Sequence, residues 1–133
     1  MEIVAYQKYV RTSPRKIQLI ADAVRQMHPT QALTNLEFMH KRAADVLKRV
    51  LNQAVKNAVN NSGLNEKDLK IKHILVEKGP QYKRFNAASR GRARTILKKT
   101  SHIKVVLEGK EVKKVQEEPK TDKKTKENSK LKK

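Results

Sequence analysis

Cysteine is absent from this chain of 133 residues, and aromatic residues make up only 4% of it. The first absence excludes disulfide bonds, thiolate metal sites and a cysteine nucleophile. No apolar run approaches the roughly 18 residues that a membrane-spanning helix needs. The first residues show neither the apolar core nor the cleavage site of a signal peptide. We therefore expect a soluble, cytoplasmic protein with one domain.

Residue sets for catalysis or metal binding are also missing. The four histidines, His28, His40, His73 and His102, are far apart in the sequence, and none has the spacing of a zinc ligand pair. No glycine-rich phosphate loop or nucleophile elbow occurs. The acidic residues are scattered and form no cluster with a histidine or serine. The sequence predicts a protein that is not an enzyme and that uses no cofactor or metal.

Positive charge is what the chain has in excess, with 32 Lys and Arg against 13 Asp and Glu and a net charge of +19. Such a charge repels itself in a compact state and indicates a polyanionic partner. Residues 78–107 hold nine basic residues and no acidic one. Residues 111–133 mix both signs and contain few apolar residues, so we expect a disordered basic tail there, with a marginal charged helix as the alternative.

Apolar spacing predicts several helices in the first half of the chain. Ser13, which precedes a proline, marks the start of the first helix, and this helix has to end before Pro29. Thr30 is expected to cap a short second helix. The longest helix covers about residues 41–61, where a wide apolar face repeats at helical spacing, and Gly63 ends it.

Strands are predicted on both sides of the all-basic stretch. Pro80 cannot donate to a sheet ladder, so the strand there cannot be central. We expect a hairpin arm over about residues 78–101, with Asn86 and Gly91 as the residues best suited to its turn. If about eleven residues run out and as many return, the arm spans roughly 35 Å. The predicted fold class is α+β, with helices on one face of a small antiparallel sheet and with residues 1–110 forming a single domain.

Basic and aromatic residues are interleaved along the predicted arm. Lys and Arg neutralise phosphates, and aromatic rings stack on unpaired bases. On a strand, the alternation from Arg90 through Arg92 to Arg94 would line one face with three guanidinium groups. A solvated basic loop is the alternative. The candidate RNA-binding residues of this stretch are Tyr82, Lys83, Arg84, Phe85, Arg90, Arg92, Arg94, Lys98 and Lys99.

A second cluster of cations and hydroxyls lies at the start of the first helix, where free N–H groups and the helix dipole favour phosphate. Its members are Lys8, Arg11, Thr12, Ser13, Arg15 and Lys16. A plain helix cap with solvated neighbours is the alternative. The cations of the long helix are expected to form a solvated polar face, with phosphate contact as the alternative; they are Lys41, Arg42, Lys48, Arg49 and Lys56.

Three segments carry a resemblance to a known family: RTSPRKIQLIADAVR, QALTNLEFMHKRAADVLKRVLNQAVKNAVNN and EKGPQYKRFNAASRGRARTILKKTSHIKVVL. Over about residues 3–107 the sequence resembles large-subunit ribosomal protein family number twenty-two, of the bacterial type. The resemblance implies three helices packed on a three-stranded antiparallel sheet with a long protruding hairpin. It also implies a structural constituent of the large subunit that binds its rRNA, supports assembly and lines the nascent-peptide exit tunnel with the hairpin.

The resemblance also implies partners and site residues. The expected partners are large-subunit rRNA, neighbouring ribosomal proteins and the nascent peptide, with no homo-oligomer. At the hairpin base, rRNA contacts are expected from Lys78, Lys98, Lys99, Thr100, Ser101 and His102. The tip at the tunnel constriction corresponds to Lys83, Arg84, Phe85, Asn86, Ala87, Ala88, Ser89, Arg90 and Gly91.

The sequence departs from the family pattern within the arm. Ala87 and Ala88 stand where proline and a basic residue are common, and Arg94 and Lys78 replace acidic residues. Two other functions fit the composition: a free-standing nucleic-acid-binding module and an RNA-modifying enzyme. The helices lack an evident base-reading face, and no catalytic set is present, so the ribosomal interpretation is favoured.

Overall fold

The computed structural model describes residues 1–109, and the predicted tail over 111–133 lies outside the described residues. Strands, α-helices and two short 3-10 helices follow one another along the described part. In order they are β1 (Glu2–Val10), α1 (Pro14–Val24), α2 (Pro29–Phe38), α3 (Arg42–Ser62), a 3-10 helix (Glu66–Asp68), β2 (Leu69–Ala87), a second 3-10 helix (Ser89–Gly91) and β3 (Ala93–Gly109).

The sheet is antiparallel, with β3 in the centre, β1 on one side and β2 on the other. Leu107 of β3 faces Ile3 of β1 and Ile71 of β2. The amino group of Met1 donates a hydrogen bond to the carbonyl oxygen of Gly109 at 2.9 Å. The first and last described segments therefore lie side by side, because β1 pairs with the central strand β3.

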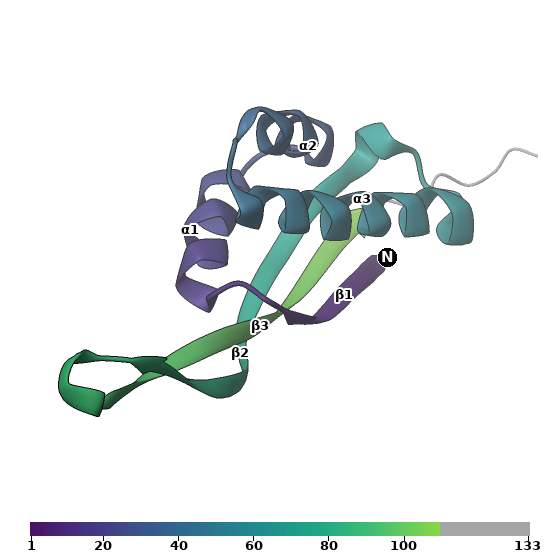
Figure 1. The fold of residues 1–133 in the computed structure, drawn as a ribbon. Coiled ribbons are helices and arrows are strands. Elements are labelled where there is room, and N and C mark those ends of the chain that lie inside the picture. Colours follow the sequence, from purple (N-terminus) through teal and green to yellow (C-terminus); the bar gives the residue numbers. More distant parts are fainter. Residues whose placement is uncertain (110–133) are drawn as a thin grey trace, which may run out of the picture.

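All three helices cover the same face of the sheet, and the opposite face has no helix on it (Figure 1). Buried side chains of β1 and β3, such as Ala5 and Val105, pack into the same core as those of the helices. α3 contributes the most to this core, with its buried residues running from Ala43 to Ala58 at helical spacing. The predicted α+β class, with three helices on a three-stranded antiparallel sheet, is confirmed.

Helix ends follow the chemistry of the residues that form them. Ser13 has an extended backbone and precedes Pro14 at the first position of α1, where the missing N–H of proline has no cost. At the end of α3, Gly63 has a left-handed backbone with φ of 61°, and its N–H donates to the carbonyl oxygen of Val59 at 3.1 Å. Both ends agree with the predictions.

The predicted start of the second helix was wrong. α2 begins at Pro29 with His28 as its N-cap, because proline supplies a helical φ and lacks the N–H that a first-turn residue leaves unbonded. Thr30 is already inside the helix, and its Oγ1 lies 2.8 Å from Nδ1 of His28. The imidazole Nε2 lies 3.0 Å from the carbonyl oxygen of Lys67, which ties the start of α2 to the segment before β2.

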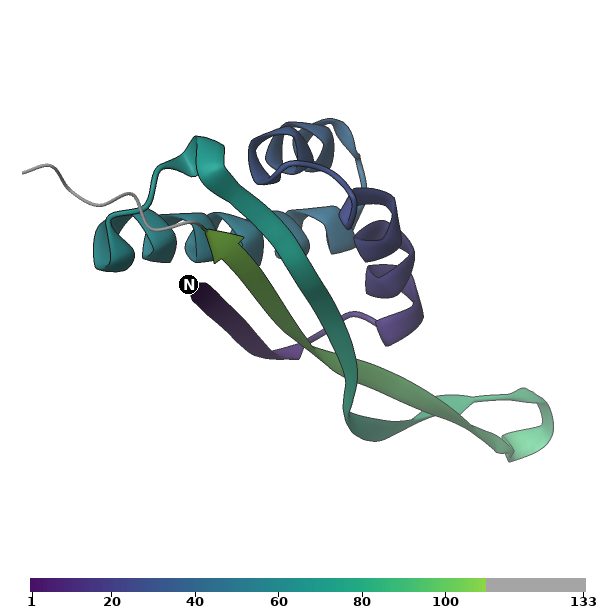
Figure 2. The ribbon, with the colours of Figure 1, turned by 180° about the vertical axis from the view of Figure 1, so that it is seen from behind.

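β2 and β3 continue past the end of β1 as a two-stranded hairpin that projects from the domain (Figures 1 and 2). We call residues 78–101 the arm, since β1 makes its last pairing with β3 at Ser101 and Ser101 also faces Lys78. The ten residues from Lys78 to Ala87 span about 30 Å. The pairing shifts register between Lys78 and Gln81, and Pro80 is accommodated there because β2 is an edge strand.

The ion pairs found among residues 1–109 belong to the helices and the sheet. They join Arg25 with Asp22 at 2.9 Å, Lys48 with Glu37 at 2.8 Å, and Lys72 with Glu2. Within the same range, no group of three or more histidine or acidic side chains is placed to hold a metal ion. None of the described helices has both the length and the apolar character needed to cross a membrane.

Candidate nucleic-acid interface

A groove of about 940 Å³ lies where the base of the arm meets the beginnings of α1 and α3. We call it the basal groove. Its charged lining is entirely basic and consists of Arg11, Lys16, Lys41, Arg42, Lys98 and Lys99. The rest of the lining is apolar or carries a hydroxyl group: Leu19, Ile20, Ala43, Leu97, Tyr82, Thr12, Ser13 and Thr100. A hollow with cations around an apolar lining suits a polyanion that has flat apolar parts, as a nucleic acid strand does.

Hydrogen bonds fix the wall of the basal groove that comes from the loop between β1 and α1. The Ser101 hydroxyl donates to the carbonyl oxygen of Thr12 at 2.9 Å. The N–H of Thr12 in turn donates to the carbonyl oxygen of Val10 at 2.8 Å. Since Ser101 belongs to the central strand, the loop that carries Arg11 is held at a set distance from the arm.

The residues of the arm are all exposed from residue 81 to residue 99. This stretch carries seven basic residues and no acidic one: Lys83, Arg84, Arg90, Arg92, Arg94, Lys98 and Lys99. None of the seven forms an ion pair with an acid between residues 1 and 109. Like charges this close repel one another unless an anionic partner lies between them.

Two aromatic rings are displayed on the outgoing strand of the arm. Phe85 is 74% exposed and Tyr82 is 44% exposed. The Arg84 guanidinium lies over the Tyr82 ring, 5.7 Å from its centroid, and Nη1 of Arg84 donates to the carbonyl oxygen of Lys83 at 2.8 Å. Exposed rings beside guanidinium groups are the surfaces on which unpaired bases stack.

The turn of the arm contains Gly91, as predicted, but it does not contain Asn86. It is closed by the N–H of Ala88, which donates to the carbonyl oxygen of Arg92 at 2.8 Å. Arg90 and Gly91 adopt left-handed backbones, with φ of 58° and 68°, whereas Asn86 is part of β2 and faces Arg94. The turn lies beyond Asn86 because pairing continues as far as Ala87 and Ala93.

The prediction that Arg90, Arg92 and Arg94 line one face of a strand was also wrong. Arg90 is in the turn, Arg92 ends it, and only Arg94 lies within β3. The alternation of strand side chains therefore does not apply to Arg90. Of the predicted tip residues, Lys83 to Ala87 form the last part of β2, and the remaining four belong to the turn.

Two predicted contact residues are not on the surface. Thr100 is 3% exposed and Ser101 is fully buried. The Thr100 hydroxyl donates to the carbonyl oxygen of Pro80 at 2.6 Å, so both hydroxyls stabilise the base of the arm. Ser101 therefore presents no surface to an RNA partner, and Thr100 contributes only a small exposed part to the lining of the basal groove.

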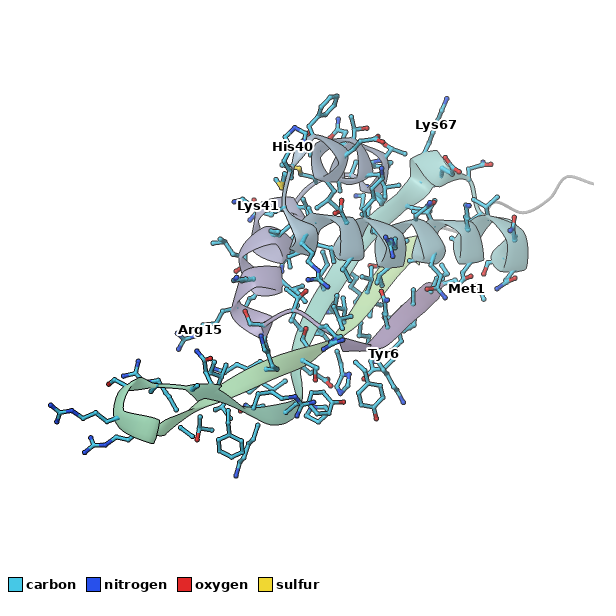
Figure 3. All side chains as sticks on the ribbon, viewed as in Figure 1. Met1, Tyr6, Arg15, His40, Lys41 and Lys67 are labelled. Carbon is cyan, nitrogen blue, oxygen red and sulfur yellow. The ribbon has the colours of Figure 1, made fainter. Side chains whose placement is uncertain are left out.

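The remaining predicted residues divide between the groove and other surfaces. Arg11, Thr12, Ser13 and Lys16 line the basal groove together with Tyr82, Lys98 and Lys99. Arg15 points outward from the start of α1 (Figure 3). Lys8 lies over the ring of Tyr6, 5.4 Å from its centroid. Lys78 is exposed in β2, and His102 is half-buried on β3.

Lys41 and Arg42 line the basal groove, although the sequence favoured a different position for them. They were expected to belong to a solvated helix face, but they line the basal groove opposite the arm, and Lys41 lies at the start of α3 (Figure 3). The available signal was their position: they come directly before Ala43, the first buried residue of α3. The first residues of α3 face the groove at the end of the helix. Arg49 and Lys56 lie further along α3 and do not line the groove.

One protein-family model, described as ribosomal protein L22p/L17e, matches residues 5–108. The match covers more than three quarters of the chain, from β1 through the whole arm to the end of β3. The chain belongs to the ribosomal protein L22p/L17e family. As a member of this family it is a structural protein of the large ribosomal subunit, resident in the ribosome among rRNA and other ribosomal proteins.

Membership of the L22p/L17e family confirms the family resemblance found in the sequence. The members of this family are structural proteins of the ribosome, which favours the ribosomal interpretation over a free-standing nucleic-acid-binding module. The arm and the segments that form the basal groove all lie inside the matched residues 5–108.

Proposed function

We propose that residues 1–110 act as one rRNA-binding domain, with the basal groove and the exposed arm as a continuous RNA-binding surface. The observation that carries the proposal is the seven basic residues, without one acid, among the exposed residues 81–99. Lys98 and Lys99 belong to the arm and also line the groove. RNA that follows the arm toward its base therefore leads into the groove.

The affinity of this surface comes mainly from phosphate neutralisation and the release of counterions. Unpaired bases add stacking on the exposed rings of Tyr82 and Phe85. An isolated two-stranded arm is marginally stable in water, so RNA packed around residues 81–99 stabilises its conformation. Such a protein supports subunit assembly because it binds separate RNA segments with its groove and with its arm.

The arm is also proposed to line the exit tunnel for the nascent peptide. It extends about 30 Å from the domain, and it has no buried side chain between residues 81 and 99. A two-stranded element of this kind fits between RNA walls where a helical layer does not. Its tip has small residues at Ala87, Ala88, Ser89 and Gly91, which leave the backbone accessible to a passing chain.

The RNA-binding surface is tested by the salt dependence of binding to transcribed large-subunit rRNA. Lys98→Ala combined with Lys99→Ala is expected to lower the slope of log affinity against log salt by about 0.9 for each phosphate that the variant no longer neutralises. The control, Arg49→Ala with Lys56→Ala, removes the same charge from positions of α3 outside the groove. Equal slopes for the two double variants would reject the groove and the arm as the RNA-binding surface.

The tunnel proposal is tested in assembled ribosomes that carry a stalled nascent peptide. A photo-crosslinking amino acid at position 88, in the turn of the arm, is expected to couple to the peptide. The same amino acid at position 52, an exposed position on α3, is expected to give no such product. Coupling to the peptide from position 52 alone contradicts the proposed position of the arm.

A further inference from the structure

An aromatic cluster lies on the open side of the sheet, away from the helices and outside the basal groove. It consists of Tyr6, Tyr9 and His102. The His102 ring is stacked with Tyr6, with centroids 6.4 Å apart and planes at 28°, and it meets Tyr9 edge-on at 4.9 Å. Tyr6, labelled in Figure 3, lies on the side of β1 that faces away from the helices.

The backbone holds Tyr9 in an unusual conformation. Its φ is 57°, in the left-handed region that a bulky residue rarely adopts. The β1–β3 pairing is irregular between Gln7 and Val10, and the N–H of Tyr9 donates to Nδ1 of His102 at 3.0 Å instead of to a strand partner. A specific side-chain hydrogen bond therefore maintains this conformation.

The conformation places the Tyr9 ring in solvent instead of in the core. Tyr9 is 60% exposed, and the neighbouring Tyr6 is 38% exposed. A strained backbone that only exposes an apolar ring gains nothing for the packing of the domain, and such strain is typical of functional positions. The ring is also pre-oriented, which reduces the ordering cost when a flat partner binds.

The charges around the aromatic cluster select the kind of partner. The Lys8 ammonium lies 5.4 Å from the centroid of the Tyr6 ring, and Lys104 faces Tyr6 across the strands. On the other side of β3, Glu77 faces His102, which disfavours a phosphate directly against the imidazole. Aromatic faces with cations at one side suit a base on the rings and its phosphates beside the lysines.

We propose that the aromatic cluster is a stacking site for an unpaired RNA base, with Tyr9 as the ring that contacts the base and His102 as the residue that positions Tyr9. The proposal rests on the proposed rRNA binding and adds a second contact on the opposite side of the domain from the helices. RNA would then contact both the groove side and the open side of the sheet.

The test uses the full chain and a single-stranded RNA oligonucleotide that contains 2-aminopurine, a fluorescent base that is quenched by stacking. Tyr9→Ala is expected to weaken binding roughly tenfold and to reduce the quenching, as removal of one base–aromatic stack does. Tyr9→Phe keeps the ring and the Cβ, so it is expected to bind within about twofold of the wild type. Circular dichroism checks that both variants are folded.

The variant Tyr82→Ala removes an exposed ring of the arm. The quenching that this variant retains comes from rings outside position 82, including Tyr9, so the two contributions can be compared. The RNA contact is then located by ultraviolet crosslinking of a 4-thiouridine RNA, followed by digestion with trypsin. A crosslink in the peptide of residues 9–11, which follows Lys8 and ends at Arg11, supports the proposal. Wild-type affinity and quenching in the Tyr9→Ala variant, with no crosslink in that peptide, would overturn it.

The outcomes also distinguish this proposal from the proposed function. If Tyr9→Ala binds like the wild type while the Lys98 and Lys99 double variant is weakened, rRNA binding stands and the stacking site does not. If the wild-type chain itself fails to bind RNA, the proposed function fails. If Tyr9→Ala instead weakens association with another ribosomal protein and leaves RNA binding unchanged, the cluster is a protein-binding surface and the stacking proposal is wrong.

Discussion

At the scale of single residues, Tyr9 differs from the other residues of β1 in its backbone conformation, although the sequence around it is typical of a strand. Tyr9 has a left-handed φ of 57° inside β1, although nothing in the segment from Gln7 to Val10 suggests a turn. Its conformation depends on the irregular pairing with β3 and on the imidazole of His102. The strain is therefore a property of the assembled sheet.

Tyr9→Gly and Tyr9→Ala both remove the ring, but only glycine relieves the strain. We expect the glycine variant to be the more stable of the two by about 1 kcal/mol, the usual cost of a left-handed backbone for a residue with a Cβ. Urea unfolding followed by circular dichroism measures the difference. Equal stabilities would mean that the backbone at position 9 relaxes once the ring is removed.

Gly79 and Gly91 are required for different reasons. A Cβ at Gly79 would lie 2.5 Å from Oγ1 and 3.2 Å from the carbonyl carbon of Thr100. We expect Gly79→Ala to destabilise the domain by roughly 1–3 kcal/mol, as overpacking does, because it disturbs the hydrogen bond from Thr100 to Pro80. The free energy of unfolding measures this effect.

Gly91→Ala is the matched comparison for Gly79→Ala. A Cβ at Gly91 meets nothing within 4 Å, and its cost comes from a φ of 68°. This cost, about 1 kcal/mol, destabilises the exposed turn of the arm and leaves the core of the domain unaffected. We expect global unfolding to be almost unchanged, and an equal decrease of stability in the two variants would contradict the close contact at the base of the arm.

Glu2 and Lys72 form an exposed ion pair between β1 and β2. The hydrogen bond and the charge of Lys72 lower the pKa of Glu2, and the same contacts raise the pKa of Lys72. A lowered folded-state pKa gives stability that is present above the ordinary pKa of glutamate and disappears as the pH falls through the folded value.

We therefore expect Glu2→Gln to lower the midpoint of thermal unfolding slightly at neutral pH and not at strongly acidic pH. The difference is also expected to shrink in high salt, because exposed ion pairs are screened. Thermal unfolding at several pH values measures it. A difference that persists at strongly acidic pH would show that another contact, and not the carboxylate charge, is responsible.

At the scale of elements, the arm is separate from the core. The buried apolar residues of the domain end at Ile74 on β2 and resume at Ile103 on β3. The arm is held at its base by the hydroxyls of Thr100 and Ser101. Beyond them, its exposed strands are joined only to each other.

Removing the arm is therefore expected to leave the domain folded. Gln81 and Lys99 are directly paired, so residues 82–98 can be replaced by Asn-Gly, which forms a two-residue hairpin turn. We expect this variant to keep its helical circular dichroism and its cooperative unfolding while its binding to rRNA weakens. Loss of cooperative unfolding would show that the arm contributes to the core.

The control for this deletion changes the register. Replacing residues 82–97 by the same turn joins Gln81 to Lys98, which are not partners. A shift of one residue reverses the side chains of a strand between its two faces, so this variant is expected to be less stable than the in-register deletion. Equal stabilities would mean that the irregular segment around Pro80 absorbs the shift.

At the scale of the whole molecule, the net charge is divided unevenly between the first 77 residues and the residues that follow. Residues 1–77 carry 13 basic and 7 acidic residues, and the described ion pairs lie among them. Residues 78–107 carry nine basic residues and no acid. Eight of these nine basic residues lie in the arm, residues 78–101, which has no buried apolar residue to oppose the repulsion.

This division predicts different salt responses for the free and the assembled protein. Binding to isolated rRNA is expected to weaken steeply with salt. An arm enclosed by RNA in the assembled large subunit, as proposed, would have buried contacts that salt screens less, so the chain is expected to co-sediment with the subunit after a high-salt wash. Complete release by the wash would contradict an arm enclosed by RNA.

Much of the fold follows from local patterns. The apolar repeat and Gly63 predict α3, Ser13 and its following proline predict the start of α1, and Pro80 predicts an edge position for β2. The second helix was misplaced because Pro29 favours an earlier start than Thr30 does. Gly91 was correctly predicted to lie in the turn of the arm, whereas Asn86 was not, because strand pairing extends beyond Asn86.

The candidate site was predicted only in part, because it combines residues that are distant in the chain. Lys41 and Arg42 approach Lys98 and Lys99 only after α3 has packed on the sheet. In the same way, Tyr9 meets His102 only through the pairing of β1 with β3. The spacing of these residues along the sequence does not predict that they are neighbours, since their distance in space depends on how the strands pair and how the helices pack.

The order of the residues is enough to locate the charge, the helices and the hairpin, because these depend on composition, on short periodicities and on residues such as Pro80 and Gly63. Packing in three dimensions brings cations from three separate segments around one groove, buries Thr100 and Ser101, and leaves Tyr9 strained and exposed. The physical reason is that local patterns act over a few residues. Burial, register and the distances between side chains are instead set by the packing of helices on a sheet whose central strand comes last in the described chain.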